Sequence, residues 1–80
     1  MNYEVLYPKD TSVVIVPREE LEQFKNTWRY HHKLEIAQLS YASQIAKVIW
    51  VGTYHDGDIL YALDGIPGIW HECCLRRAPQ

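Results

Sequence analysis

Two β-rich segments flank an Asp-Gly dipeptide in the C-terminal half of the chain, and this arrangement restricts the folds that the chain can adopt. Residues 45–54 and 58–63 are rich in β-branched and aromatic side chains, and Asp56-Gly57 between them is typical of a two-residue hairpin turn. The tetrapeptide Gly65-Ile66-Pro67-Gly68 then reverses the chain again before residues 69–73. The pattern predicts an antiparallel β-meander of three strands.

The predicted turn also sets which residues of the strands lie opposite each other. With two residues in the turn, Gly52 lies opposite Tyr61 and Trp50 opposite Leu63, and a four-residue second loop places Trp70 opposite Leu63. Because side chains alternate across a strand, one face is then mostly aliphatic or small and the other is aromatic. The aromatic face would carry four candidate binding residues: Trp50, Tyr54, Tyr61 and Trp70.

The first 16 residues predict a β-hairpin. Tyr3, Val5 and Tyr7 alternate with their neighbours as in a strand, and Pro8-Lys9-Asp10 suits a turn. The β-branched run 13–16 then supplies the second strand.

A helix is predicted over residues 18–30. Pro17 suits the first helical position, and Leu21, Phe24 and Trp28 are spaced so that they form one apolar stripe. Residues 31–44 are predicted to be mostly loop, with a short helical turn as the alternative. Together these elements predict a single α+β domain spanning residues 1–80.

Composition and charge indicate which cellular compartment and which classes of partner to expect. The chain has 80 residues, of which 48% are hydrophobic, and a formal net charge of −2, so it has no overall positive field that would attract nucleic acid. The two cysteines, Cys73 and Cys74, are adjacent and would close almost no loop if bonded, which favours a reducing, cytoplasmic environment. We expect no secretory leader in residues 1–10 and, since no apolar run approaches the roughly 20 residues needed, no membrane span.

The C-terminal part of the chain carries a longer pattern, V-x-x-V-G-x-Y-H-x-G-D-x-L-Y-x-L-x-G-x-P-G-x-W-H-E-x-C-L, within residues 46–76. It resembles the terminal strands of small SH3-like β-barrels in uncharacterised bacterial proteins, some of which are carried on mobile gene cassettes. The resemblance covers about the last 35 residues. It implies a strongly bent five-stranded barrel and no assigned activity, and the predicted helix at 18–30 departs from a minimal barrel of this kind.

The most reactive cluster in the sequence is His71-Glu72-Cys73-Cys74. A zinc site would need about four converging ligands, and adjacent cysteines point to opposite sides of a strand. A nucleophilic cysteine would need a nearby imidazolium and a positive environment, which Glu72 and Asp64 weaken. We therefore expect neither a metal nor a cofactor, and a small enzyme or metal protein that uses His71 with Cys73 or Cys74 remains the alternative function.

The other histidines have local explanations. In His55-Asp56-Gly57-Asp58 the turn accounts for the residue types, and His31-His32 suits the negative end of the preceding helix.

The leading hypothesis is a non-catalytic binding module. The aromatic residues Trp50, Tyr54, Tyr61 and Trp70 would either form a platform for another protein or a second copy of the chain, or pack against the stripe on the helix. Nucleic acid is a disfavoured partner, since Lys47 is the one cation between residues 44 and 75.

Overall fold

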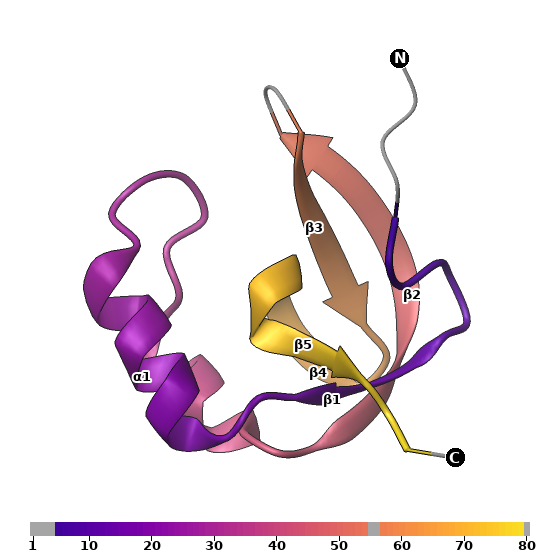
Figure 1. The fold of residues 1–80 in the computed structure, drawn as a ribbon, viewed down its shortest axis with the longest axis horizontal. Coiled ribbons are helices and arrows are strands. Elements are labelled where there is room, and N and C mark those ends of the chain that lie inside the picture. The colour runs from indigo at the N-terminus through magenta and orange to yellow at the C-terminus, as the bar shows by residue number, and fades with distance from the viewer. Residues whose placement is uncertain (1–4, 55–56, 80) are drawn as a thin grey trace.

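The computed structural model describes residues 5–54 and 57–79 and has an α+β fold. One α-helix and two short 3-10 helices, η1 and η2, accompany five strands (Figure 1). In chain order these are β1 (Ser12–Ile15), α1 (Arg18–Thr27), η1 (Ile36–Tyr41), β2 (Ile45–Tyr54), β3 (Asp58–Leu63), β4 (Ile66–His71), η2 (Glu72–Cys74) and β5 (Leu75–Arg77). The predicted helix and the three predicted C-terminal strands are therefore confirmed as elements.

The five strands form one antiparallel sheet in the order β4-β3-β2-β1-β5. The long strand β2 joins its two parts, because its first residues pair with β1 and its later residues pair with β3. In Figure 1, β2 curves along most of its length, so that the two parts of the sheet face different directions. The ladder does not close on itself: among the described residues, β4 and β5 are its edges.

The predicted N-terminal hairpin is wrong. Strand β1 pairs with β2 on one side and with β5 on the other, so it has no free edge for residues 5–7. Tyr7 instead inserts its ring into the core, where its hydroxyl donates to the Leu75 carbonyl over 3.2 Å. The alternation that suggested a strand in fact reflects a single buried tyrosine; Tyr3, the first residue of that pattern, lies outside the described residues.

Helix α1 ends three residues earlier than predicted. Pro17 is its N-cap, Glu19 and Glu20 lie in its first turn, and the chain leaves the helix at Trp28, whose backbone is extended. The Trp28 indole Nε1 donates to the His31 carbonyl over 2.6 Å, which turns the chain back towards the sheet. Of the predicted stripe, Leu21 is fully buried, while Phe24 and Trp28 are partly buried and stack on each other.

The segment predicted to be mostly loop contains η1, which is fastened to β4 by Gln38. The Gln38 side chain is buried, accepts from the Glu35 backbone N–H over 2.9 Å and donates to the Ile69 carbonyl over 3.1 Å. Gly68 has a φ of +96°, a conformation that favours glycine, and a Cβ there would lie 2.8 Å from Gln38 Nε2. The short-helix alternative was the better of the two.

The strand register is one residue away from the predicted one. Tyr54 pairs with Asp58 and Gly52 with Leu60, so three residues rather than two lie between the paired ends of β2 and β3. Two of those three, His55 and Asp56, lie outside the described residues. The second loop is shorter than predicted, because Leu63 pairs with Ile66 and Tyr61 pairs with Trp70. Every cross-strand neighbour predicted for Gly52 and Trp70 is therefore wrong.

The core combines residues from all five strands with Leu21 of α1. Its fully buried members include Val13, Val48, Tyr61 and Trp70. No helix in the described part of the chain is both long and apolar enough to cross a membrane.

Candidate functional site

The four aromatic residues predicted to share one face are divided between the two faces of the sheet. Residues that pair across neighbouring strands point to the same side, so Val51, Tyr61 and Trp70 share one face, which we call the inner face. Trp50 and Tyr54 alternate with Val51 and belong to the opposite, outer face. The prediction of a single aromatic face is wrong. The register of β2 against β3 differs by one residue from the predicted one, and such a shift moves the β2 side chains to the opposite face relative to those of β3.

The inner-face pair is part of the core. Tyr61 and Trp70 are 0% exposed. The Tyr61 hydroxyl donates to the Glu72 carboxylate, and burial, followed by this hydrogen bond, raises the pKa of Tyr61 well above its ordinary value. Neither ring can meet a partner unless the fold opens.

Trp50, in contrast, is an aromatic side chain that remains 46% exposed. The pairing of β2 with β3 is irregular between Val48 and Trp50, and both Ile49 and Trp50 are exposed as a result. The Trp50 ring lies over Gly52 so closely that a Cβ at Gly52 would overlap ring atoms Cη2 and Cζ2. Glycine at position 52 thus provides the surface on which the indole rests.

A shallow hollow of about 520 Å³ adjoins this indole. We call it the Trp50 hollow, and its lining is apolar apart from one lysine: Val5, Pro8, Lys9, Ile49, Trp50 and Val51. The sequence did not indicate that residues 5–9 would contribute, because their place beside β2 depends on Tyr7 being anchored in the core. The adjacent apolar residues Ile49 and Trp50 were the available signal, but the irregular pairing that exposes both is not visible in the sequence.

The outer face around Tyr54 is covered by histidines. The ring of His31 lies 3.9 Å from that of Tyr54, and His31 Nε2 donates to the Asp58 carboxylate over 2.6 Å. Since that nitrogen carries the proton, Nδ1 of a neutral His31 accepts from Nδ1–H of His32 over 2.9 Å. Tyr54 is therefore partly buried beneath the segment that follows α1 and is a weaker binding candidate than Trp50.

His71 is buried on the same face beneath that segment. Its ring packs against Phe24, Trp28 and His31, and its Nε2–H donates to the His32 carbonyl over 2.9 Å. Burial lowers the pKa of His71, an effect that this hydrogen bond partly offsets. The described residues contain no group of three or more histidine, cysteine or acidic side chains placed to hold a metal ion.

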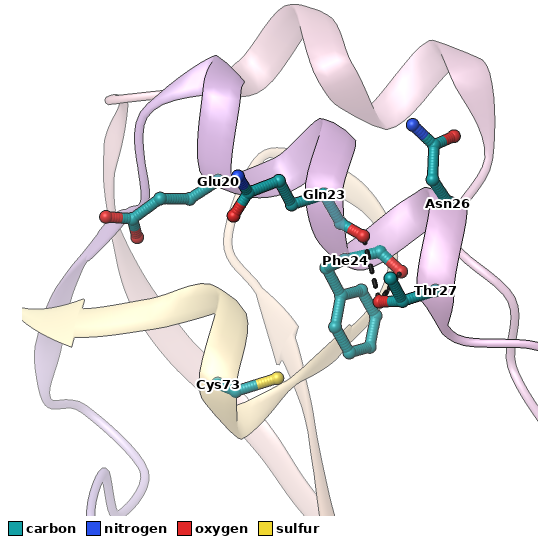
Figure 2. A pocket seen from close by; sticks show the side chains of 6 residues that line it. All are labelled: Glu20, Gln23, Phe24, Asn26, Thr27 and Cys73. Atoms are coloured by element: carbon teal, nitrogen blue, oxygen red, sulfur yellow. Dashed lines mark hydrogen bonds between the residues drawn. The ribbon is translucent and has the colours of Figure 1, made fainter.

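The two cysteines are free thiols with opposite exposures. Cys73 is exposed and Cys74 is 1% exposed, because η2 turns the chain between β4 and β5 at this point. Cys73 lines a hollow of about 700 Å³ beneath α1, with Glu20, Gln23, Phe24, Asn26 and Thr27 (Figure 2).

The structure brings His71 and Cys73 to the lining of one smaller hollow of about 250 Å³. Within the described residues, however, no hydrogen bond joins the imidazole to the thiol, and the His71 Nε2–H is committed to a backbone carbonyl. This arrangement gives the imidazole no contact through which it would take the thiol proton, as a Cys/His nucleophilic pair requires.

Comparison with known proteins leaves the chain without a match, whether to protein-family models, to curated proteins or to solved structures.

Proposed function

We propose that this protein is a non-catalytic binding module that holds a segment of a partner protein in the Trp50 hollow. The observation that carries the proposal is the half-exposed indole of Trp50, which packs over Gly52 and lines a hollow that is apolar apart from Lys9. Tryptophan is enriched among the residues that contribute most to binding energy at interfaces. A ring that already packs over the backbone at Gly52 has less side-chain entropy to lose when a partner covers it than a ring with no such contact.

The size of the hollow favours a peptide segment over a second copy of the chain. A stable interface between two proteins usually takes about 20–30 residues from each side and about 800 Å² from each partner. The Trp50 hollow is lined by six residues, well below the roughly 20–30 residues per side of such an interface. An area of about 800 Å² would also be a large share of the 5366 Å² of accessible surface on this small protein. Six lining residues suit the few side chains that an extended segment inserts.

The proposal can be tested with a displayed library of random short peptides. We expect peptides selected on the wild-type protein to lose at least about 30-fold in affinity for Trp50→Ala, in line with the loss of about 2 kcal/mol or more that defines a major binding residue. Ile36→Ala is the matched control, because Ile36 is 74% exposed and lies outside the lining of the hollow. The affinity of Ile36→Ala for the selected peptides should equal that of the wild type.

Two results would contradict this assignment. Selected peptides that bind Trp50→Ala as tightly as the wild type would remove the hollow from consideration. A dimer seen by sedimentation equilibrium that dissociates in Trp50→Ala would show that a second copy, and not a peptide, occupies this surface.

An SH3-like architecture is part of the same proposal. Three features support it: the strand order β4-β3-β2-β1-β5, the bent strand β2 shared by both parts of the sheet, and the 3-10 helix before β5. The resemblance of residues 46–76 to the terminal strands of such barrels agrees with this order. In this architecture, α1 and η1 form one long insertion between β1 and β2.

A further inference from the structure

The two edges of strand β2 are paired over different lengths. On one edge, β1 pairs with residues 45–47, and the two residues that precede β1 extend this pairing to the N–H and C=O of Val48. On the other edge, β3 pairs with residues 48–54. In Figure 1, β2 continues well past the end of β1 towards the hairpin. Over residues 49–53, the edge on the β1 side therefore has no partner strand among the described residues.

This open edge presents backbone groups that the sheet does not use. In an antiparallel pair, every second residue directs its N–H and C=O away from the partner strand. Half of these groups over residues 50–53 thus point away from β3, and within the described residues no hydrogen bond reaches them across the open edge. All four residues are exposed or partly exposed. A stretch of this kind can pair with a strand from another chain.

The Trp50 hollow lies along this edge and not on a face of the sheet. Trp50 on the outer face and Val51 on the inner face both line it. Because the strand separates its two faces, side chains from both can share one hollow only at an edge, and β3 occupies the other edge. The facing wall belongs to residues 5–9, which we call the N-terminal strap. The hollow is therefore a slot between the open edge and the strap.

Hydrogen bonds hold the strap to the core and to β5. The Tyr7 backbone N–H donates to the Tyr61 hydroxyl over 3.4 Å, and the Tyr7 hydroxyl donates to the Leu75 carbonyl. Arg77 Nη2 donates to the Leu6 carbonyl over 2.8 Å. In the part of the chain that the structure describes, no hydrogen bond joins the strap to β2. The slot thus has two walls, and the strap leaves the backbone groups of the open edge unused.

The charge in the slot is positive. Lys9 is the single ionisable residue of the lining, and it takes part in none of the ion pairs among the described residues. Asp10, its neighbour in sequence, lies outside the lining. The remaining lining is apolar. The slot therefore suits an extended segment that places an apolar side chain against Trp50 and an acidic side chain near Lys9.

We propose that the partner segment binds as an added β-strand along residues 49–53 of β2, between this edge and the strap, with a carboxylate paired to Lys9. The inference rests on the binding function proposed above and specifies the class of partner, an acidic segment in extended conformation. The added strand takes the side of β2 that the β1 pairing leaves after Val48. Backbone hydrogen bonds supply affinity in this mode of recognition, and contacts with alternate side chains supply selectivity.

The test uses synthetic copies of a peptide selected on the wild-type protein, each with one backbone nitrogen methylated. Methylation removes one N–H donor and leaves every side chain in place. Since an added strand directs every second N–H to its neighbour, affinity should fall about tenfold or more at alternate positions of the bound stretch and change by no more than about twofold at the positions between them. Isothermal titration calorimetry measures the affinities, and the tolerated positions serve as matched controls.

Amide hydrogen exchange, followed by nuclear magnetic resonance, detects the same contact from the protein side. In the free chain, the amides of residues 50–53 that face the open edge should exchange fast, and those bonded to β3 should exchange slowly. The unmodified peptide should slow the first set, because its carbonyls accept from those N–H groups.

Lys9→Glu tests the charge of the partner. We expect it to weaken the binding of an acidic selected peptide by about threefold or more, since it replaces an attraction by a repulsion at an exposed site. Lys33→Glu is the matched control, because Lys33 is exposed, lies outside the slot and undergoes the same change of charge.

The outcomes separate this inference from the function on which it rests. A peptide that requires Trp50 but tolerates methylation at every position, or that leaves exchange at residues 50–53 unchanged, would overturn strand addition and leave the Trp50 hollow as the binding site. Equal losses in Lys9→Glu and Lys33→Glu would overturn the pairing with Lys9. A library that yields no peptide sensitive to Trp50→Ala would overturn the proposed function and this inference together.

Discussion

The inner and outer faces of the sheet treat the same residue type in opposite ways. Trp70 on the inner face is 0% exposed, whereas Trp50 on the outer face is 46% exposed and rests on a glycine. Both lie in β-rich segments, and both were predicted to occupy one aromatic face. The difference shows that strand register, rather than residue type, decides whether an aromatic side chain in this sheet supports the fold or is available to a partner.

The two faces also differ in how their buried polar groups are partnered. On the inner face, the Trp70 indole N–H is buried and has no hydrogen-bond partner among the described residues, a cost that its packing must offset. On the outer face, polar side chains such as His31, His71 and Asp58 hold one another and the following segment in place. The inner face therefore combines apolar packing with the Tyr61–Glu72 hydrogen bond, whereas the covered part of the outer face is held by the contacts of its histidines.

The largest effect should come from replacing Trp70 with alanine. We expect Trp70→Ala to lower the free energy of unfolding by about 3–5 kcal/mol, because it removes a large, fully buried side chain from the core. Since small domains have only about 5–15 kcal/mol in total, much of the margin would be lost. Urea denaturation followed by far-ultraviolet circular dichroism measures this change.

Trp50→Ala is the matched control for that measurement. It removes the same side chain from a half-exposed site, so we expect a loss of about 1 kcal/mol or less. Equal losses in the two variants would contradict the division of the sheet into a supporting face and an available one.

A smaller effect is expected at Gly52, where the outer face depends on a missing side chain. Its φ angle is not positive, so alanine is compatible with the backbone, but the new Cβ would displace the Trp50 ring. We expect Gly52→Ala to cost about 1–3 kcal/mol, as for other overpacked sites, and to change the fluorescence of Trp50.

The double variant Trp50→Ala/Gly52→Ala tests whether the loss of stability comes from the clash with the Trp50 ring or from alanine itself at position 52. When Trp50 is also alanine, the clash is absent, and Gly52→Ala should be neutral or slightly stabilising, because alanine restricts the unfolded chain more than glycine does. The same cost in both backgrounds would show that the indole does not rest on Gly52.

These differences between the faces mark the limit of what the sequence could reveal. Local patterns were sufficient for the helix that begins at Arg18 and for the strands on either side of Asp56-Gly57, because propensity and periodicity act over a few residues. The register required knowing whether two or three residues connect β2 and β3, and Asp-Gly occurs in both kinds of hairpin. One residue of error was sufficient to place all four aromatic candidates on one face.

The long-range contacts were harder still. Strand β1 lies between β2 and β5, and nothing near residues 12–15 in the sequence indicates that residues 75–77 will occupy its second edge. The Trp50 hollow and the hollow beneath α1 both join segments distant in sequence, such as Val5 with Val51 and Gln23 with Cys73. For the cysteines, the adjacent pair was visible, but their opposite exposures depend on η2, where a strand was expected.

The smallest expected effect concerns pH and isolates the directed contacts of the outer face. Burial lowers the pKa of His71 below the ordinary value of about 6.5 that the ring has in the unfolded chain. Above that value the ring is neutral in both states, and its contribution to stability is fully present. As the pH falls below it, the unfolded chain takes up the proton first, so the free energy of unfolding decreases until the pH reaches the lower pKa of the folded state. Because the His32 carbonyl offsets part of the shift, the change should be smaller than those at Trp70 and Gly52.

Urea denaturation of the wild type and of His71→Gln across the mildly acidic range would measure this contribution. Glutamine can still donate to the His32 carbonyl but does not titrate, so the variant should lose part of the wild-type decrease in stability towards low pH. Because the two proteins differ at this position alone, the difference between their pH dependences reports the buried ring of His71 in its surroundings. An identical pH dependence in the two proteins would mean that this ring is accessible to protons in the folded state, and that the segment after α1 does not seal the outer face as it does in the structure.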